Sequence, residues 1–228
     1  MSDRIYRTKC ETHKDETHKE KRILKMKCRY ITIEREYGSG GTEIAKQLSE
    51  QTGIPCYGQE ILQKVADAYD TTIEKIEKYE ENVSNSFLYS IYMMSQAASG
   101  KSDMLAADGH IYVAEQEVIK RLAANTSAIF LGHCASEALK EKNGVINVFI
   151  HCSDEKAKRE RIIKTYDIPE SKVDVVQRKY DKKRANYYNV NTERQWEDFK
   201  QYDIVLDSGK LGIDGCVRIL KAILEVQD

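Results

Sequence analysis

Short apolar runs alternate along the chain with longer segments whose apolar residues recur at helical spacing. The runs are rich in β-branched residues, which is typical of buried parallel strands. They lie at residues 29–33, 55–57, 128–132, 145–150 and 202–207. After the first run, Ile44, Ala45 and Leu48 fall on one side of a helix. Strands that alternate with helices predict an α/β fold with a parallel sheet and helices on both faces.

Two further segments are predicted to be helices by the same pattern. Residues 60–124 hold apolar positions at helical spacing, interrupted by a polar break at 97–103. After the run at 145–150, Ser153 is the expected N-cap of a basic helix, because serine side chains accept hydrogen bonds from the first turn. A very polar helix is expected over residues 169–185. The predicted strands and helices therefore begin near residue 29 and continue to the end of the chain.

The first 28 residues are almost entirely polar, and the sequence ETHKD at 11–15 is nearly repeated as ETHKE at 16–20. We predict a polar extension at 1–28 followed by a single larger domain at 29–228. Cys10, His13, His18 and Cys28 are a candidate zinc set, because thiolate and imidazole both bind zinc. Their spacing matches no standard zinc motif and favours a solvated tail.

Composition narrows the class of protein. The chain has 228 residues, of which 41% are hydrophobic and 32% charged, and none of its apolar runs approaches the ~20 residues of a membrane span. Its 36 Lys and Arg nearly balance 37 Asp and Glu, which argues against DNA, RNA or anionic membranes as partners. The six cysteines form no CxxC pair and no signal peptide precedes them, so we expect reduced thiols in the cytoplasm.

A glycine-rich turn joins the first predicted strand to the first predicted helix. Gly38-Ser39-Gly40-Gly41 is followed by Thr42, and such a turn exposes backbone N–H groups that bind phosphate at a helix N-terminus. The loop departs from the P-loop pattern GxxxxGK[ST], because Gly41 stands in the place of the lysine and Arg35 in the place of the first glycine. A purely structural turn is the alternative, although three glycines in four residues favour close approach of a ligand.

Four segments in order resemble the signatures of the cytidylate kinase-like family: 31–41, 128–135, 181–188 and 206–213. The resemblance covers the chain from about residue 29 to its end. It implies a P-loop nucleoside monophosphate kinase fold, with a five-stranded parallel sheet, a helical insert at about 58–110 that holds the acceptor monophosphate, and a lid at about 165–195. It further implies ATP and Mg²⁺ as cofactors and a nucleoside monophosphate such as CMP as the acceptor.

Positive charge is concentrated in the segment that the resemblance identifies as the lid. Five cations fall within seven positions: Arg178, Lys179, Lys182, Lys183 and Arg184. On a helix Arg178 and Lys182 share a face, and a closing lid would bring cations to the transferring phosphoryl group. We therefore expect Arg178, Lys182 and Arg184 to be catalytic. A solvated basic helix balanced by Asp174 and Asp181 is the alternative from charge alone.

The resemblance implies further ligand contacts, and each has a structural alternative. Thr42 is expected to bind Mg²⁺, or else to cap the helix. His133 is expected to contact phosphate, or else to be structural, and Glu43 and Arg159 are otherwise surface residues. The expected cofactor-binding residues are Gly38, Ser39, Gly40, Gly41, Thr42, Glu43, His133 and Arg159.

Three positions depart from the charged residues that this family usually carries. Relatives usually have arginine at the positions of Thr42 and His133, and aspartate at the position of Gly58. Because positioned charges stabilise the transition state of phosphoryl transfer, more than one function stays open. The first is an ATP-dependent kinase of CMP, the second a non-catalytic nucleotide or phosphate sensor, and the third a kinase of another small phosphate acceptor.

Overall fold

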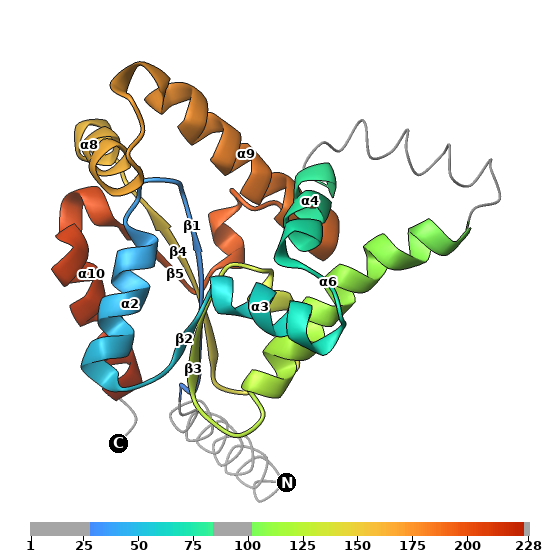
Figure 1. Cartoon of the computed structure of the whole chain (residues 1–228). Helices are drawn as coiled ribbons and strands as arrows, with labels where there is room; N and C mark the ends of the chain where they lie inside the picture. The colour runs from blue at the N-terminus through green and yellow to red at the C-terminus, as the bar shows by residue number, and fades with distance from the viewer. Residues whose placement is uncertain (1–27, 84–101, 226–228) are drawn as a thin grey trace, which may run out of the picture.

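The computed structural model describes residues 28–83 and 102–225 of the chain (Figure 1). Its elements, in order, are β1 (Tyr30–Arg35), α2 (Gly41–Thr52), β2 (Cys56–Tyr57), α3 (Gln59–Ala68), α4 (Ile73–Val83), α6 (Ser102–Leu122), β3 (Ala128–Leu131), α7 (Ala135–Ala138), β4 (Val145–His151), α8 (Glu155–Tyr166), η1 (Glu170–Lys172), α9 (Val173–Thr192), η2 (Phe199–Gln201), β5 (Ile204–Asp207) and α10 (Ser208–Glu225). The predicted alternation of strands and helices is confirmed.

All five strands form one parallel sheet in the order β2-β3-β1-β4-β5. The strand β1 lies at its centre, where Ile31 is in register with Ile129 of β3 and Ile146 of β4. Its residues are buried from Tyr30 to Glu34, because helices cover both faces of the sheet (Figure 1). This explains why the strand is a continuous apolar run in the sequence instead of an alternating one.

Each face of the sheet has its own hydrophobic core, since successive side chains of a strand point to opposite faces. Tyr30 and Phe130 pack against α3 and α6, whereas Ile31 and Ile129 pack against α2 and α10. Figure 1 shows these two pairs of helices on opposite sides of the sheet. The strands are thereby fixed, and their carboxyl ends meet at one edge.

The helix α2 begins and ends at glycines in the left-handed conformation. Gly40 has φ of 83° at the N-cap and Gly53 has φ of 69° at the C-cap, where its N–H donates to the carbonyl oxygen of Ser49. Side chains other than glycine rarely adopt this conformation, so both ends of α2 are set by the sequence. The first end belongs to the glycine loop.

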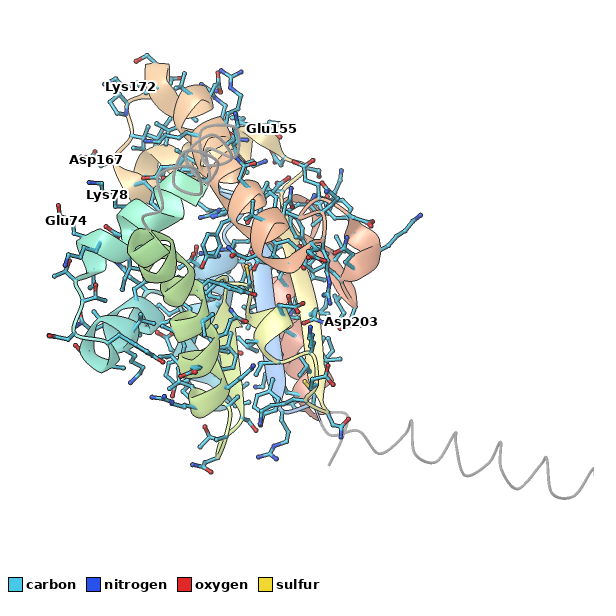
Figure 2. The ribbon with its side chains drawn as sticks, turned by 90° about the vertical axis from the view of Figure 1, so that its right-hand side faces the viewer. Glu74, Lys78, Glu155, Asp167, Lys172 and Asp203 are labelled. Atoms are coloured by element: carbon cyan, nitrogen blue, oxygen red, sulfur yellow. The ribbon has the colours of Figure 1, made fainter. Side chains whose placement is uncertain are left out.

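The helices α8 and α9 differ in detail from the prediction. Ser153 is not the N-cap of α8, because the Asp154 carboxylate accepts the N–H of Ala157 at 3.0 Å. The helix α9 continues past the predicted end at 185 to Thr192, since Tyr187 and Tyr188 on its last turns are buried. Figure 2 labels Glu155, Asp167 and Lys172 along this part of the chain, so its outer surface carries charges of both signs.

The described residues of 29–83 and 102–225 build one sheet with its flanking helices, and the described parts of the predicted insert and lid fall on α3, α4 and α6 and on α9. Residues 1–27 lie outside the described part, and with them Cys10, His13 and His18 of the candidate zinc set. The fourth member, Cys28, is buried in the core, where its thiol donates to the carbonyl oxygen of Tyr30. Among the helices of 28–83 and 102–225, none has the length and apolar character needed to cross a membrane.

Candidate functional site

The glycine loop after β1 is held in shape by its own hydroxyl group and by the start of α10. The Ser39 hydroxyl donates to the carbonyl oxygen of Glu36 at 2.8 Å, and the Ser208 hydroxyl donates to the carbonyl oxygen of Ser39 at 2.6 Å. A Cβ atom on Gly40 would lie 2.4 Å from Ile213 Cδ1. The loop is therefore preorganised, which is what a phosphate cradle requires.

Two cationic side chains of α8, Lys158 and Arg161, contact the glycine loop. Lys158 is 4% exposed, and its Nζ lies 2.9 Å from Glu36 Oε2. Burial acts to lower the pKa of Lys158, but the pairing with Glu36 outweighs it and the pKa lies above its usual value. The Arg161 guanidinium donates to the carbonyl oxygen of Gly38. Arg161 thus holds the backbone of the loop, whereas Lys158 holds the Glu36 side chain at the start of the loop.

The helix α9 is fastened to the same loop. The Tyr37 ring stacks between Tyr166 and Tyr180, with ring centroids 4.7 and 4.6 Å away. The Tyr37 N–H donates to Asp181 Oδ1 at 2.6 Å, and Arg184 donates to the carbonyl oxygen of Arg35 at 3.1 Å. The segment predicted to be a lid thus lies over the glycine loop in this structure.

A cavity of about 380 Å³ opens between the end of the sheet, the helices α3 and α4, and α9. It lies at the carboxyl ends of β1 and β3, which is where open parallel sheets bind ligands. Its walls are formed by Glu34, Arg35, Thr42, Gly58, Gln59, Leu62, Glu77, Leu131, Gly132, His133, Cys134, Tyr180, Lys183, Arg184, Tyr187 and Tyr188. The residues from α9 recur at intervals of three and four, so one face of that helix forms the wall.

Arg35 is the cation that the sequence prediction missed. Its stem packs on Gly41, whose added Cβ would lie 2.7 Å from Arg35 Cβ, and its guanidinium reaches Gly132, whose added Cβ would lie 2.4 Å from Nη1. Arg35, which stands where a P-loop has its first glycine, therefore extends past Gly41, which stands where a P-loop has its lysine. It brings a permanent positive charge to the junction of the glycine loop and β3.

Glu34 is a buried carboxyl group in the wall of the same cavity. Its Oε2 accepts the indole N–H of Trp196 at 3.2 Å. Burial raises the pKa of Glu34, whereas Arg35, the Trp196 hydrogen bond, Arg184 and His133 act to lower it. The group is thus enclosed by cations, and the net charge of the cavity wall follows its protonation.

The structure separates the predicted lid cations into two groups. Arg184 lines the cavity together with Lys183, which was not among the expected catalytic residues. Arg178 and Lys182 are exposed and do not line it. Arg159 is ion-paired with Asp174 at the start of α9. The cavity therefore gathers Arg35, Lys183 and Arg184 as its permanent cations.

The remaining predicted residues lie in or beside the loop. Thr42 and His133 both line the cavity. Glu43 is exposed, and its Oε1 accepts the side-chain N–H of Gln47 at 3.3 Å, so it lies on the solvent side of α2. Gly38 and Gly40 have φ of 76° and 83°, and the added Cβ of Gly41 would meet Arg35. A side chain at Gly38, Gly40 or Gly41 would therefore collide with a neighbouring side chain.

Mg²⁺ fits this site only in the manner of a substrate-bound ion. The described residues contain no cluster of three or more His, Cys, Asp or Glu side chains able to hold a metal by themselves. Thr42 offers an exposed hydroxyl group in the cavity wall. Mg²⁺ is commonly held by one or two protein oxygens together with phosphates and water, so Thr42 and the ligand's phosphates form a sufficient donor set.

Asp181 makes the stability of the folded protein depend on pH. Burial raises the pKa of Asp181 from 3.8 to about 6. The folded protein thus binds this proton more tightly than the unfolded chain, and stability is lost as pH rises from about 4 to about 6. Asp181→Asn keeps an oxygen for the Tyr37 N–H, and we expect it to stabilise the protein at pH 7 by ~1–3 kcal/mol and by almost nothing near pH 4.

Urea denaturation of wild type and Asp181→Asn at the two pH values measures this difference. Asp174→Asn is the matched control, since its side chain is 64% exposed on the same helix and its ion pair with Arg159 lies at the surface. A difference of equal size at both pH values would show that the Asp181 charge has no part in it.

The structure resembles solved proteins over most of its length. An uncharacterized protein from Eubacterium ventriosum is 26% identical, with a TM-score of 0.64, and the match covers 86% of this chain and 98% of that one. A shikimate kinase from Bacteroides thetaiotaomicron is 12% identical, with a TM-score of 0.47 and coverage of 86% and 98%. A shikimate kinase from Acinetobacter baumannii, in complex with shikimate, is 14% identical, with a TM-score of 0.43 and coverage of 88% and 95%.

A search of curated proteins finds no match to this chain. The model of the cytidylate kinase-like family matches residues 30–210, which is most of the chain and includes the glycine loop, the cavity and α9. The resemblance noted in the sequence is thereby confirmed, and the parallel five-stranded sheet agrees with it. The chain belongs to the cytidylate kinase-like family.

Proposed function

We propose that the protein is a nucleotide-binding phosphotransferase that transfers the γ-phosphoryl group of ATP to a nucleoside monophosphate such as CMP. The observation that carries this proposal is the cavity beside the glycine loop, into whose wall Arg35, Lys183 and Arg184 are brought from β1 and α9. Phosphoryl transfer needs positioned positive charge and little covalent chemistry from the protein. Membership of a kinase-like family supports the same reaction class.

The residues divide the work between donor and acceptor. The backbone N–H groups of the glycine loop, at the start of α2, bind the donor phosphates, and Thr42 holds Mg²⁺ with them. Bound Mg²⁺ neutralises charge on the phosphates. Arg35 lies between the glycine loop and the end of β3, so its guanidinium contacts the group in transfer. Arg184 and Lys183 close over it from α9 and exclude water.

The acceptor occupies the side of the cavity formed by the predicted insert. Gln59 and Leu62 of α3 and Glu77 of α4 line this side. A cavity of about 380 Å³ lies within the range of small-molecule sites, and its polar and apolar side chains suit a nucleoside with its phosphate toward the cations. CMP is the proposed acceptor, and UMP, dCMP and AMP are the competitors to be compared with it.

A coupled assay of ADP release with saturating Mg·ATP tests this proposal. We expect turnover with CMP above the rate without acceptor, and a lower kcat/KM with AMP, whose larger base needs more room. Turnover with a non-nucleotide phosphate acceptor alone would assign the third function named above. Absence of turnover with every acceptor would refute the phosphotransferase.

The second function, a non-catalytic nucleotide or phosphate sensor, is favoured by two features. Gly41 occupies the place of the P-loop lysine, and the N–H of Tyr37 already donates to Asp181. A sensor would bind nucleotide without transferring phosphate. Thermal stabilisation by ATP or CMP together with zero turnover identifies it, whereas absence of both refutes either function.

A further inference from the structure

The turn after β3 has an unusual backbone. Gly132, His133 and Cys134 have φ of 80°, 56° and 51°, so three consecutive residues are left-handed. Residues other than glycine adopt this conformation at a cost, and such strain gathers at functional sites. The side-chain amide of Gln116 in α6 donates to the carbonyl oxygen of His133 at 3.2 Å. The fold thus holds His133 in a strained turn at the cavity wall.

Behind His133 lies a carboxyl group that the cavity does not use. Glu115 of α6 is 0% exposed, and its Oε2 accepts the hydroxyl group of Tyr187 from α9. Its Oε1 lies 3.7 Å from His133 Nδ1 and, within 28–83 and 102–225, accepts no hydrogen bond. A buried carboxylate is costly unless a cation pairs with it, and the imidazolium form of His133 is the cation in reach.

Charged groups of several elements face His133. Glu115 approaches from α6, Glu34 from β1 and Glu60 from α3, and the two last interact electrostatically with His133. Arg35 and Arg184, which line the same cavity, oppose a positive charge there. The His133 side chain is 14% exposed, so water screens these charges poorly. Lys183 in the same wall opposes a positive charge as well, and the group that favours the protonated ring is the buried Glu115 carboxyl, 3.7 Å from Nδ1.

We propose that Glu115 is a positioning residue that holds His133 as an imidazolium at the cavity wall, so that a phosphate-bearing ligand is bound through a contact that requires a proton. The proposal rests on the cavity as the phosphate site of the proposed function. Nδ1 faces Glu115, and the protonated ring presents Nε2–H as a donor to a phosphate oxygen. Where the ring is neutral, binding takes up one proton from solvent. Affinity for phosphate-bearing ligands therefore falls as pH rises.

Binding is measured without ATP, with CMP and inorganic phosphate as the probes, between pH 5.5 and 8.5. Trp196 is the single tryptophan of the chain, and its indole N–H donates a hydrogen bond to Glu34 in the cavity wall. Tryptophan fluorescence therefore serves to measure ligand binding in the cavity. We expect the affinity of wild type for CMP to fall about tenfold across this range. Glu115→Gln is expected to bind less tightly at neutral pH and to move the decline to lower pH.

His133 variants separate positioning from packing. His133→Arg carries a permanent charge and is expected to lose the decline in affinity with rising pH. In the His133→Asn background, Glu115→Gln is expected to have no further effect on affinity, because the two residues act through one contact. The matched control is Glu117→Gln, an exposed position of the same helix that pairs with Arg121. It should leave the pH profile unchanged.

Two results would overturn the inference: a wild-type affinity that is independent of pH, or a Glu115→Gln effect of equal size with and without His133. If Glu115→Gln fails to fold, the melting temperatures of the His133 variants test the inference instead. His133→Asn leaves Glu115 without its cation and should melt lower than His133→Arg at pH 8, and equal melting at pH 8 refutes the pairing. Wild type that binds neither probe refutes the cavity assignment, and hence the proposed function, whereas pH-independent binding refutes this inference alone.

Discussion

Replacing Arg35 by leucine is expected to lower kcat/KM for phosphoryl transfer about 10²–10³-fold. The guanidinium of Arg35 reaches Gly132 while its stem packs on Gly41, so its charge is held at the junction of the glycine loop and β3. In the proposed function it substitutes for the missing P-loop lysine. With Arg35 gone, the pKa of Glu34 is left higher still, because Arg35 is the foremost charge that lowers it. ADP release with CMP, at several concentrations of each substrate, measures the loss.

Arg29→Leu is the matched control for this variant. Arg29 precedes the same strand at its opposite end and is exposed, where its guanidinium lies 5.8 Å from the Tyr30 ring. We expect its activity to stay within about twofold of wild type, as is usual for a surface substitution. Arg35→Lys should recover part of the activity, since it keeps the charge but loses the planar fork. Equal activity of Arg35→Leu and Arg29→Leu would remove Arg35 from the transition state.

The fold was predictable from the sequence because its central strands are buried on both faces. A strand such as β1 has no solvent side, so its apolar run is continuous and easily located. The end of α9 was not predictable in the same way. Its first half is polar, and only the packing of Tyr187 and Tyr188 near Trp196, in one aromatic core, extends the helix to Thr192. That packing joins residues distant in sequence, which local spacing does not reveal.

The site was predictable in its loop and less so in its charges. Helical spacing groups Arg178 with Lys182, but it does not say which face of α9 meets the sheet. The burial of Tyr187 turns Lys183 and Arg184 inward and leaves the other two outside. From the sequence, Arg35 was interpreted only as the absence of a P-loop glycine. An arginine at the carboxyl end of a central parallel strand is itself an indication of a ligand-binding residue, because ligands bind at that edge of the sheet.

Glu115 carried a further signal that the sequence reading passed over. It follows Ala114 and precedes Val118 and Ile119, all three buried in one core. A carboxyl group at such a position of a helix is rarely buried without a partner. What the sequence does not supply is the identity of that partner, because His133 and Tyr187 come from a strained turn and from a different helix.

Gly40→Asp is expected to abolish the thermal stabilisation that ATP or CMP gives to the wild type. The variant places a carboxylate at the N-terminus of α2, the proposed site of the donor phosphates, where it would repel them. Its Cβ would also lie 2.4 Å from Ile213 Cδ1 and 3.3 Å from Arg161 Cζ. We would measure the shift of the melting temperature at about 5 mM ATP or CMP, a concentration that saturates most enzymes with their substrates. A retained shift would place the nucleotide somewhere other than the glycine loop.

Two variants separate the charge from the strain of the backbone. Gly40→Ala adds the same Cβ at φ of 83° without a charge, and Ile213 can give way because its contact is the end of a flexible side chain. Gly53→Asp adds a carboxylate at φ of 69° at the other end of α2, where nothing lies within 4 Å. In both variants the left-handed backbone conformation of a residue other than glycine lowers the stability of the fold by ~1–2 kcal/mol. If the loop binds phosphate, Gly53→Asp keeps the full ligand shift, Gly40→Ala keeps part of it, and Gly40→Asp alone loses it, since only there do anion and carboxylate compete for one place.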